Sequence, residues 1–528
     1  MLSILKQKQF SKLILLMTWF SSLQLAGQVM ICSDAVNLYS VERNAIVAGV
    51  ADRYLSSRFD HEWRQSLSDG SPGLITSVAG DKLLRQERLK WYPEIRVRAA
   101  LNGGDLRTEG ATVDAAPIVT TAAHYRLPFL TRLGLVTWMR FEKHSVVGAE
   151  SLSPFEYDFS RQKEAGRESF HNSDSNWVEY DIGDAGVHLI HPGGEITFAK
   201  SNPIWGTGYS GQLWLSDKAP SFPLLSLRHR FGDRWLFSFM HGSLNSTFRD
   251  STYFELHPVK GGLPMIRKYS VAHRLDFFLR QNIRLGFGES VIYGGRSVEM
   301  SYMLPFLFYW SAQHDLSDSD NLQMFLDFEA IGKNRGRLYG SLFLDEWDFM
   351  NTFNQEKSHN WLAYQVGVTV LLPLFPSSVP LLRAEYTHLS PYVYVHRSKI
   401  NTFEHHGYPL GFWSGPNSDS FFLGVEAAPS DKLWFQLYSV ISRRGEVTEE
   451  TVERQYNRER IDFLYRTYSG AAERKTVLGL RGDLLSSRPI RIRFDFSYQI
   501  WDQHLSLSSL QRQNRSKLDG IVEVSLGF

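Results

Sequence analysis

The sequence of 528 residues contains a single cysteine, Cys32, so an internal disulfide is excluded. Beyond its first residues it has no run near the roughly 20 apolar residues that a membrane-spanning helix requires, because the run at 303–310 is too short and contains Pro305. An excess of one charge is also lacking, since 57 Lys and Arg nearly balance 56 Asp and Glu. These absences exclude a helical membrane protein, and the charge balance argues against nucleic acid as a partner.

The amino terminus has the pattern of a secretory signal peptide. Three lysines precede the apolar run 13–20, and small and polar residues follow as far as Ala26 and Gly27. We expect residues 1–27 to be removed on export. Cys32 follows Ile31 instead of a small residue, which argues against attachment of a lipid to the cysteine.

From residue 93 onward the dominant pattern is alternation of apolar and polar residues. The stretch IRIRFDFSYQIW at 490–501 places its isoleucines and phenylalanines on one face of a strand and its arginines on the other. A soluble sheet would bury the apolar face against a second layer, whereas a membrane barrel would turn it toward lipid. Charged residues recur in mid-strand elsewhere, as at Arg96, Arg383 and Arg481, which favours the barrel.

Further features favour a transmembrane barrel. Aromatic residues make up 14% of the chain, as expected where aromatic girdles mark two membrane interfaces. At about 10 residues per strand, with short turns alternating with long polar loops, residues 93–528 accommodate roughly 16 to 20 strands. The chain ends in Phe528, which resembles the terminal aromatic of bacterial outer-membrane barrels. We predict an all-β fold, a transmembrane antiparallel β-barrel of about 18 strands over residues 93–528.

Residues 28–92 differ in pattern from the barrel region. The stretches 41–57 and 78–91 carry apolar residues at near-helical spacing among charges. We predict a small, mostly helical element on the periplasmic side. A soluble cap or linker and a plug inside the barrel end are both compatible with the sequence.

No motif in the sequence indicates catalysis. GYSG at 208–211 lacks the second glycine of a nucleophile elbow, because position 212 is Gln. EHH at 404–406 lacks the spacing of a zinc site, and GFGESVIYGG at 286–295 lacks the Lys-Ser or Lys-Thr of a phosphate-binding loop. We therefore expect no catalytic residues, no metal and no cofactor.

Several segments together resemble the capsule assembly protein Wzi family. They include WGTGYSGQLWLSDKAPSFPLL at 205–225, YMLPFLFYW at 302–310 and HHGYPLGFWSGPNSDSFFLGVE at 405–426, and they occur in the family's order over roughly residues 200–450. Further matching segments are 273–295, 320–330 and 338–349. The resemblance implies an 18-stranded outer-membrane barrel with a periplasmic helical element. It also implies a non-catalytic lectin that helps to attach or assemble capsular polysaccharide or exopolysaccharide at the cell surface.

A polysaccharide offers hydroxyls, carboxylates and apolar sugar faces, so its binding site needs aromatic, polar and cationic side chains. The predicted binding residues are Trp205, Tyr209, Trp214, Lys218, Trp413, Asn417 and Asp419. An interface girdle and loop packing are the structural alternatives for these residues. Charged and polar residues predicted to pair with one another inside the lumen are Glu289, Arg296, Asp320, Asn321, Asp327, Arg335, Arg337, Asp345, Glu346 and Asp348.

Two other functions are compatible with a barrel. A porin-like diffusion channel would line its water-filled pore with the same charges, and a barrel-embedded enzyme would need a serine, a histidine and an acid or amide near one membrane interface. The expected partners are polysaccharide and outer-membrane lipid, with no nucleic acid, and the expected state is a monomer. The sugar recognised is left open.

Overall fold

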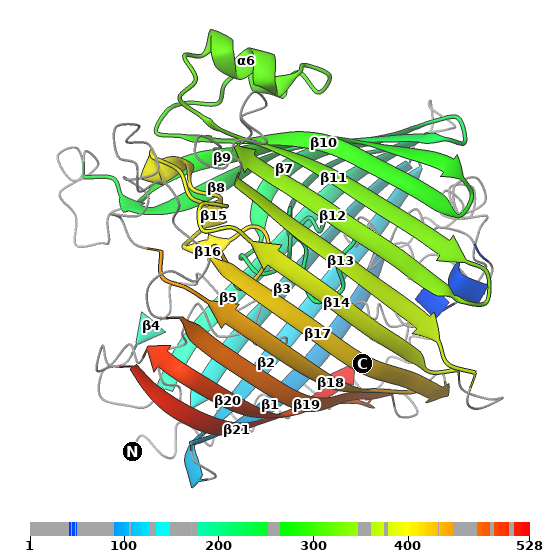
Figure 1. Ribbon diagram of the computed structural model, residues 1–528, viewed down its shortest axis with the longest axis vertical. Coiled ribbons are helices and arrows are strands. Elements are labelled where there is room, and N and C mark those ends of the chain that lie inside the picture. The colour runs from blue at the N-terminus through cyan, green and yellow to red at the C-terminus, as the bar shows by residue number, and fades with distance from the viewer. Residues whose placement is uncertain are drawn as a thin grey trace. The chain divides into compact units, whose positions relative to one another are not determined.

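The alternating segments form one antiparallel sheet that closes on itself in a computed structural model of the chain (Figure 1). All described residues belong to one unit, residues 31–528. The predicted signal peptide lies outside the described residues. The structure describes residues 42–43, 45–47, 49, 89–104, 107–126, 134–147, 170–171, 177–191, 193–251, 264–346, 361–373, 379–430, 432–447, 472–485, 490–505 and 512–527.

Eighteen long strands make up the closed sheet in the described part of the chain. They are β1 (Leu89–Gly104), β2 (Arg107–Arg126), β3 (Gly134–Val147), β5 (Trp177–His191), β6 (Gly194–Ser201), β7 (Phe222–Phe231), β8 (Trp235–Arg249), β9 (Met265–Arg280), β10 (Ile283–Gly294), β11 (Asn321–Gly332), β12 (Gly336–Glu346), β13 (Trp361–Leu371), β14 (Leu381–Leu389), β17 (Ser418–Ser430), β18 (Leu433–Arg444), β19 (Glu473–Leu485), β20 (Ile490–Leu505) and β21 (Arg512–Gly527). The shorter elements are β4 (Phe170–His171), which pairs with β5, the hairpin of β15 (Glu404–His405) and β16 (Tyr408–Pro409), η2 (Ser301–Met303), α6 (Tyr309–Asp315) and η4 (Lys399–Asn401).

The first and last strands close the barrel. β1 pairs antiparallel with β21, from Glu94 opposite Gly527 to Gly104 opposite Lys517. Each of the other long strands pairs with its neighbours along the chain, which confirms the predicted antiparallel barrel of 18 strands. β1 begins at Leu89, before the boundary expected at residue 93.

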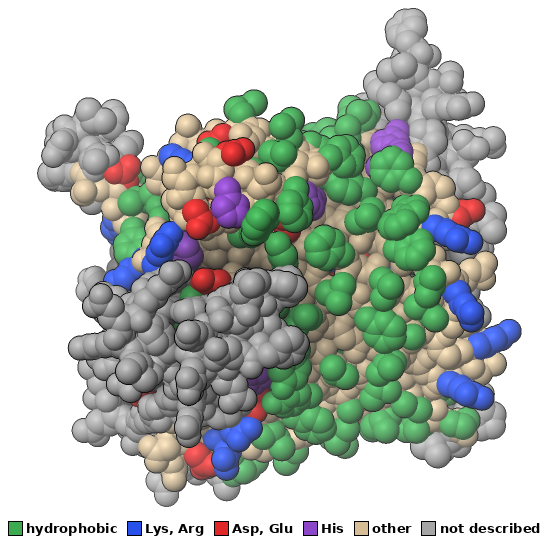
Figure 2. Space-filling model, turned by 45° about the horizontal axis from the view of Figure 1, so that its top comes forward, with side chains coloured by type: hydrophobic (Ala, Val, Ile, Leu, Met, Phe, Trp, Pro, Cys, Tyr) green, Lys and Arg blue, Asp and Glu red, His purple; other side chains and the backbone are tan. Residues whose placement is uncertain are grey.

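Alternation along each strand separates a polar inner face from an apolar outer face. In β13, Gln365 and Thr369 are fully buried while the intervening Val366 is 54% exposed. In β20, Ser497 and Gln499 are buried and Phe496 and Ile500 are exposed, so the apolar face of this strand points outward. Hydrophobic side chains cover the outer face of the strands (Figure 2), and we call this surface the outer belt. Such a surface is stable in lipid and not in water, as expected for a transmembrane barrel.

The two ends of the barrel differ in the length of their connections. At one end, the turn end, strands are joined by residues 192–193, 232–234, 281–282 and 333–335, and β1 starts and β21 finishes there. At the other, the loop end, the connections include residues 202–221, 295–320 and 390–417. Short turns at one end and long loops at the other are typical of outer-membrane barrels, whose long loops face the outside of the cell.

The described residues of the amino-terminal element contact the inner wall near the turn end. Residues 42, 43 and 45–47 are helical, and no helix among the described residues is long and apolar enough to span a membrane. Ile46 is fully buried and packs in one cluster with Ile331, Leu381 and Trp434. The backbone N–H of Asn334 donates to the carbonyl of Ile46 at 2.9 Å.

Glu42 attaches this element through a buried carboxylate. The guanidinium of Arg383 lies 2.5 Å from its Oε2, the guanidinium of Arg337 lies 3.4 Å from its Oε1, and the hydroxyl of Thr369 donates to the carboxylate at 3.0 Å. Burial alone would raise the pKa of Glu42, but Arg383 and Arg337 reverse this effect and lower the pKa from 4.5 to about 2. The ionised carboxylate is therefore stabilised in the folded protein.

We predict that Glu42 makes the attachment sensitive to acid. Because its pKa is lower in the folded state, its ionisation contributes stability above pH 4.5 that is lost as the pH falls toward 2. A shift of this size corresponds to about 3 kcal/mol. Urea unfolding of detergent-solubilised protein should show a loss of stability between pH 4.5 and 2 that is larger by this amount in the wild type than in Glu42→Gln. Equal pH dependence of the two proteins would contradict the prediction.

Candidate functional site

The connection between β6 and β7, residues 202–221, folds into the barrel; we call it the lumen segment. It leaves and re-enters the wall at the directly paired residues Ser201 and Phe222. Its backbone turns back on itself, and Trp205 and Leu215 pair as an antiparallel bridge. Side chains and backbone of the segment form hydrogen bonds with β10, β12, β13, β14, β17 and β19.

Glycines permit the tight path of the lumen segment. Gly206 has a φ of 140°, a conformation that side-chain-bearing residues rarely adopt. A Cβ atom on Gly208 would lie 2.1 Å from the carbonyl oxygen of Gly211 and 2.2 Å from Oε1 of Gln365. The sequence WGTGYSG therefore specifies a close backbone approach, which explains the glycine spacing that resembles a nucleophile elbow without forming one.

Glu385 on β14 holds the middle of the lumen segment. Its carboxylate accepts the backbone N–H of Tyr209 at 2.6 Å and that of Ser210 at 3.0 Å, and the Ser210 hydroxyl also donates to it. The hydroxyl of Tyr339 and the amide of Gln365 donate to the same carboxylate at 2.7 and 3.1 Å. This set of donors satisfies a buried carboxylate and fixes the segment against the wall.

The predicted residue Tyr209 lies inside the lumen. Its hydroxyl is within 2.7 Å of Gln436, 3.2 Å of Arg481 and 3.4 Å of Glu426, and the guanidinium carbon of Arg383 lies 4.1 Å from its ring centroid. Burial raises the pKa of Tyr209, so the hydroxyl keeps its proton. The side chain is therefore engaged by the wall on its ring and on its hydroxyl.

The predicted residues Trp205 and Trp214 are buried against each other. Their ring centroids are 4.7 Å apart, and Trp214 stacks on Phe325 of β11 at 3.5 Å. The Trp214 ring nitrogen donates to the Ser290 hydroxyl at 3.0 Å. Both rings belong to the main core cluster, so neither presents a free face for stacking on a sugar.

Charged side chains on the inner wall form continuous chains of ion pairs. One chain consists of Arg274 with Asp276 (2.6 Å) and Asp327 (2.7 Å), Arg284 with Asp276 (2.6 Å) and Glu329 (3.2 Å), and Arg337 with Glu329 (2.5 Å). A second joins Arg383 to Glu42 and Glu426, and Glu42 connects it to the first through Arg337. Full pairing is required because an isolated buried charge is costly. Two of the predicted lumen residues, Asp327 and Arg337, lie in the first chain.

Residues 390–417, between β14 and β17, lie on top of the lumen segment at the loop end; we call them the cap. The hydroxyl of Tyr394 donates to the carbonyl of Leu213, and the backbone N–H of Ser216 donates to the carbonyl of Leu410 at 2.7 Å. The backbone N–H of Tyr394 donates to the predicted residue Asp345 at 2.5 Å. The cap and the lumen segment thus form two connected layers across part of the barrel.

The histidines of the EHH motif anchor the cap. Nδ1 of His405 accepts the backbone N–H of Asn245 at 2.9 Å, and His406 contacts the Asn245 side chain at 3.0 Å. Burial, reinforced by neighbouring His406, lowers the pKa of His405 to about 3, so the ring is neutral. Lys268 of β9 donates to the carbonyl of Thr402 at 2.8 Å.

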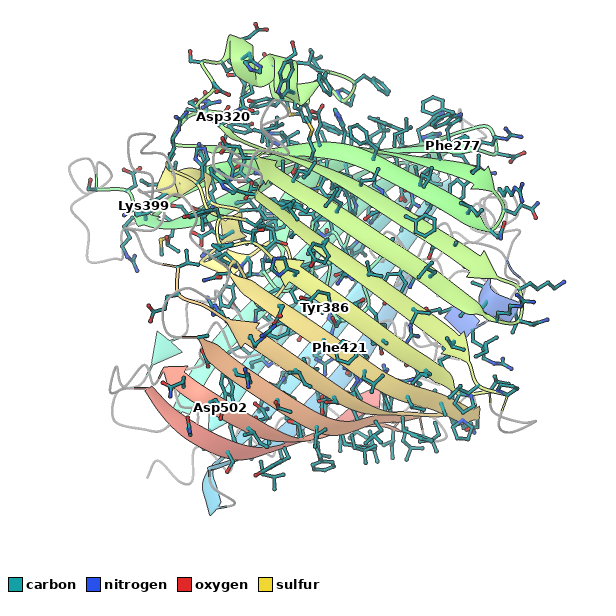
Figure 3. All side chains as sticks on the ribbon, in the orientation of Figure 1. Phe277, Asp320, Tyr386, Lys399, Phe421 and Asp502 are labelled. Atoms are coloured by element: carbon teal, nitrogen blue, oxygen red, sulfur yellow. The ribbon has the colours of Figure 1, made fainter. Side chains whose placement is uncertain are left out.

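The cap exposes two cationic side chains and partly exposes an aromatic ring. Arg397 and Lys399 are exposed, and Tyr408 is half-buried with Nζ of Lys218 5.9 Å from its ring centroid. Lys399 lies at the loop end with Asp320 (Figure 3). The cap thus carries exposed cationic groups and a partly exposed aromatic ring, which are kinds of group that suit a polysaccharide.

The other predicted binding residues also have partners in the fold. Lys218 is buried, and Trp413 is buried with its ring 5.4 Å from that of Phe412. Asn417 donates to the carbonyl of Glu446 at 2.9 Å. Asp419 forms an ion pair with Arg443 on the outer face of the wall.

The predicted lumen charges occupy several different places. Asn321 donates to the cap carbonyl of Asn401 at 2.9 Å, whereas Arg335 and Glu346 are exposed near the turn end and the loop end. Asp348 lies outside the described residues. Glu289 accepts a hydrogen bond from the backbone of Tyr309, and Arg296 donates to Asp320, so these three residues belong to or contact the connection 295–320. Glu385, Arg383, Glu426, Arg397 and Lys399 are not among the predicted site residues, although the alternation of RAE at 383–385 marks the first two as charges on one face of a strand.

A family model for the capsule assembly protein Wzi matches residues 143–514. The chain belongs to the Wzi family. Among solved structures, the Wzi protein of Escherichia coli aligns with 13% sequence identity and a TM-score of 0.54, over 95% of this chain and all of that one. That protein is described as an outer membrane protein involved in group 1 capsule assembly and as a carbohydrate-binding β-barrel.

Two other solved structures of Pseudomonas aeruginosa resemble this Wzi family member more weakly. The outer membrane protein OpdK aligns with 9% identity and a TM-score of 0.44, over 83% of this chain and 99% of its own. OpdQ aligns with 8% identity and a TM-score of 0.45, over 84% and 99%. No curated protein matches the sequence.

We predict that Arg383→Ala destabilises this Wzi family barrel by about 3–5 kcal/mol, because it leaves the buried carboxylates of Glu42 and Glu426 without their shared cation. Arg335→Ala, which removes an exposed arginine at the turn end, is the matched control. Urea unfolding monitored by tryptophan fluorescence measures both. The prediction fails if the two variants have the same stability.

We also predict that the lumen segment blocks the barrel. Ser201 and Phe222 face each other in the β6–β7 ladder, so residues 202–221 can be replaced by the two-residue turn Asn-Gly. Removal of the segment should increase single-channel conductance in planar bilayers relative to the full-length protein. Unchanged conductance in a folded variant would show that the segment does not obstruct the lumen.

Proposed function

We propose that this protein binds capsular polysaccharide or exopolysaccharide at the loop end and holds it at the cell surface without catalysing a reaction. The observation that carries the proposal is the cap, which exposes Arg397 and Lys399 and partly exposes Tyr408 at the loop end, above the packed lumen segment. Cations and an aromatic ring on an exposed face suit an acidic polysaccharide. Membership of the Wzi family supports the same function.

In this proposal the seven predicted binding residues act mainly as the support of the binding face. Trp205, Tyr209 and Trp214 fix the lumen segment, and Lys218 lies beneath Tyr408. The loop end faces the outside of the cell, and the turn end with the helical element faces the periplasm. Export through cleavage of residues 1–27 belongs to the same proposal.

A diffusion channel is the second candidate function. The inner wall of β1 and β20 carries charges that are partly exposed, including Glu94, Arg96 and Arg493. Partly exposed charges of both signs are compatible with a polar, water-filled path along this side of the lumen. Conductance of the full-length protein would favour this function.

We predict that cells lacking the protein release polysaccharide into the medium while total synthesis is unchanged. Reintroduced wild-type protein should restore retention, and the double variant Arg397→Ala, Lys399→Ala should not, because the face loses both exposed cations. Cell-bound and released polysaccharide are measured separately.

The matched control removes two exposed arginines from the turn end, Arg280→Ala with Arg335→Ala, and should retain polysaccharide as the wild type does. Normal retention in cells lacking the protein would refute the tether. If the protein is needed but the cap variant works normally, polysaccharide binds elsewhere on the barrel.

A further inference from the structure

The connection between β10 and β11, residues 295–320, lies against the outside of the barrel. Along β10, Leu285, Phe287 and Glu289 share the outer face; the first two are exposed, but Glu289 is fully buried. In Figure 1, α6 lies outside the strands beside β9 and β10. We call residues 295–320 the outer segment, because it covers the outer face of these strands near the loop end.

Glu289 fastens the outer segment by completing the start of α6. The residue before this helix, Phe308, provides no side-chain cap. The Glu289 carboxylate instead accepts the N–H of Tyr309 at 2.6 Å and that of Trp310 at 3.2 Å, and its Oε1 lies 2.9 Å from Nε2 of His273. The wall thus supplies the acceptor that a helix usually takes from its own sequence.

The underside of the outer segment is a packed apolar core of its own. Tyr302, Tyr309 and Ala312 are buried against outward side chains of β8, β9 and β10, including Phe237 and Tyr293. This cluster is separate from the core inside the lumen. The segment is therefore an integral layer of the outer wall.

Several polar groups of the segment are paired with one another. Asp320 accepts two hydrogen bonds from Arg296, at 2.8 and 2.6 Å, and one from the Tyr302 hydroxyl at 2.8 Å. Gln313 donates to the carbonyl of Asp320 at 2.9 Å. Internal pairing of this kind is what a low-dielectric environment demands.

The opposite side of the outer segment exposes large apolar side chains. Met300 is 73% exposed, Phe306 69% and Leu304 57%, and Phe308 and Trp310 are about as exposed as outer-belt residues. The ring of Phe306 stacks on that of Phe237 of β8 at a centroid distance of 4.6 Å. Phe237 lies opposite Leu275 of β9, which is exposed in the outer belt. The apolar surface of the segment is thus continuous with the belt, and large exposed apolar patches mark interaction sites.

We propose that the outer segment is inserted among the acyl chains of the outer leaflet, with Met300, Leu304, Phe306, Phe308 and Trp310 in contact with lipid. Continuity with the outer belt identifies lipid as the occupant. This inference concerns the membrane contact alone and does not depend on the proposed binding of polysaccharide.

The outer segment also holds the cap in place. Arg397 of the cap donates to the carbonyl of Asp318 at 2.8 Å, and Asn401 of the cap donates to the carbonyl of Ser319 at 3.0 Å. Insertion of the segment therefore fixes the cap at the level of the membrane surface.

The test places a single environment-sensitive fluorophore on a cysteine introduced as Met300→Cys or, separately, Phe306→Cys, in a Cys32→Ser background. The protein is reconstituted in phosphatidylcholine vesicles with or without bromine on the acyl chains, and iodide serves as the aqueous quencher. Leu437→Cys on the outer belt is the lipid control, and Asp233→Cys in a turn-end connection is the water control.

We expect labels at positions 300 and 306 to be quenched by brominated lipid and protected from iodide, as at position 437. Quenching by iodide at both positions, as at position 233, would overturn the proposal and leave the segment in water. Protection from both quenchers together with formation of dimers would also overturn it, because a second copy of the chain would then cover the surface.

Discussion

The structure depends on the pairing of charges that face the lumen. The outer faces of most strands are committed to lipid, so most polar side chains of the strands point inward, where they must find partners or water. Arg383 illustrates the solution, since it is shared by Glu42 from the amino-terminal element and Glu426 from a neighbouring strand. Arg383 thereby links the barrel wall to the helical element and to the ring of Tyr209.

Ion pairs alone do not satisfy the lumen, and the lumen segment completes the set of partners. Glu385 is stabilised by two backbone N–H groups, two hydroxyls and an amide, because the segment presents its backbone at that carboxylate. The close turn that brings these donors together requires Gly206 and Gly208. The glycine-rich sequence is thus explained by the needs of a buried acid on a strand far away in the chain.

The barrel could be predicted from the sequence because its signal is local: successive residues of a strand face opposite ways, so IRIRFDFSYQIW reveals both faces by itself. The path of long connections depends on distant partners. Trp214 looks the same in sequence whether it meets a sugar or Phe325, and only the fold places it on Phe325 and Ser290. For this reason the predicted binding residues have side chains of types that suit a polysaccharide, but most of them are buried in contacts within the fold.

One local signal in the sequence pointed to the outer segment. Alternation along β10 places Glu289 among residues that face lipid, where a carboxylate without partners is too costly to persist. Such a residue requires a cover, and the apolar run ending in Phe308, Tyr309 and Trp310 follows it closely in the chain. A charged residue at an outward position of a barrel strand, followed by an apolar connection, therefore predicts a segment folded over the outer wall. Asp419, another outward carboxylate, instead finds its partner in Arg443 of the neighbouring strand.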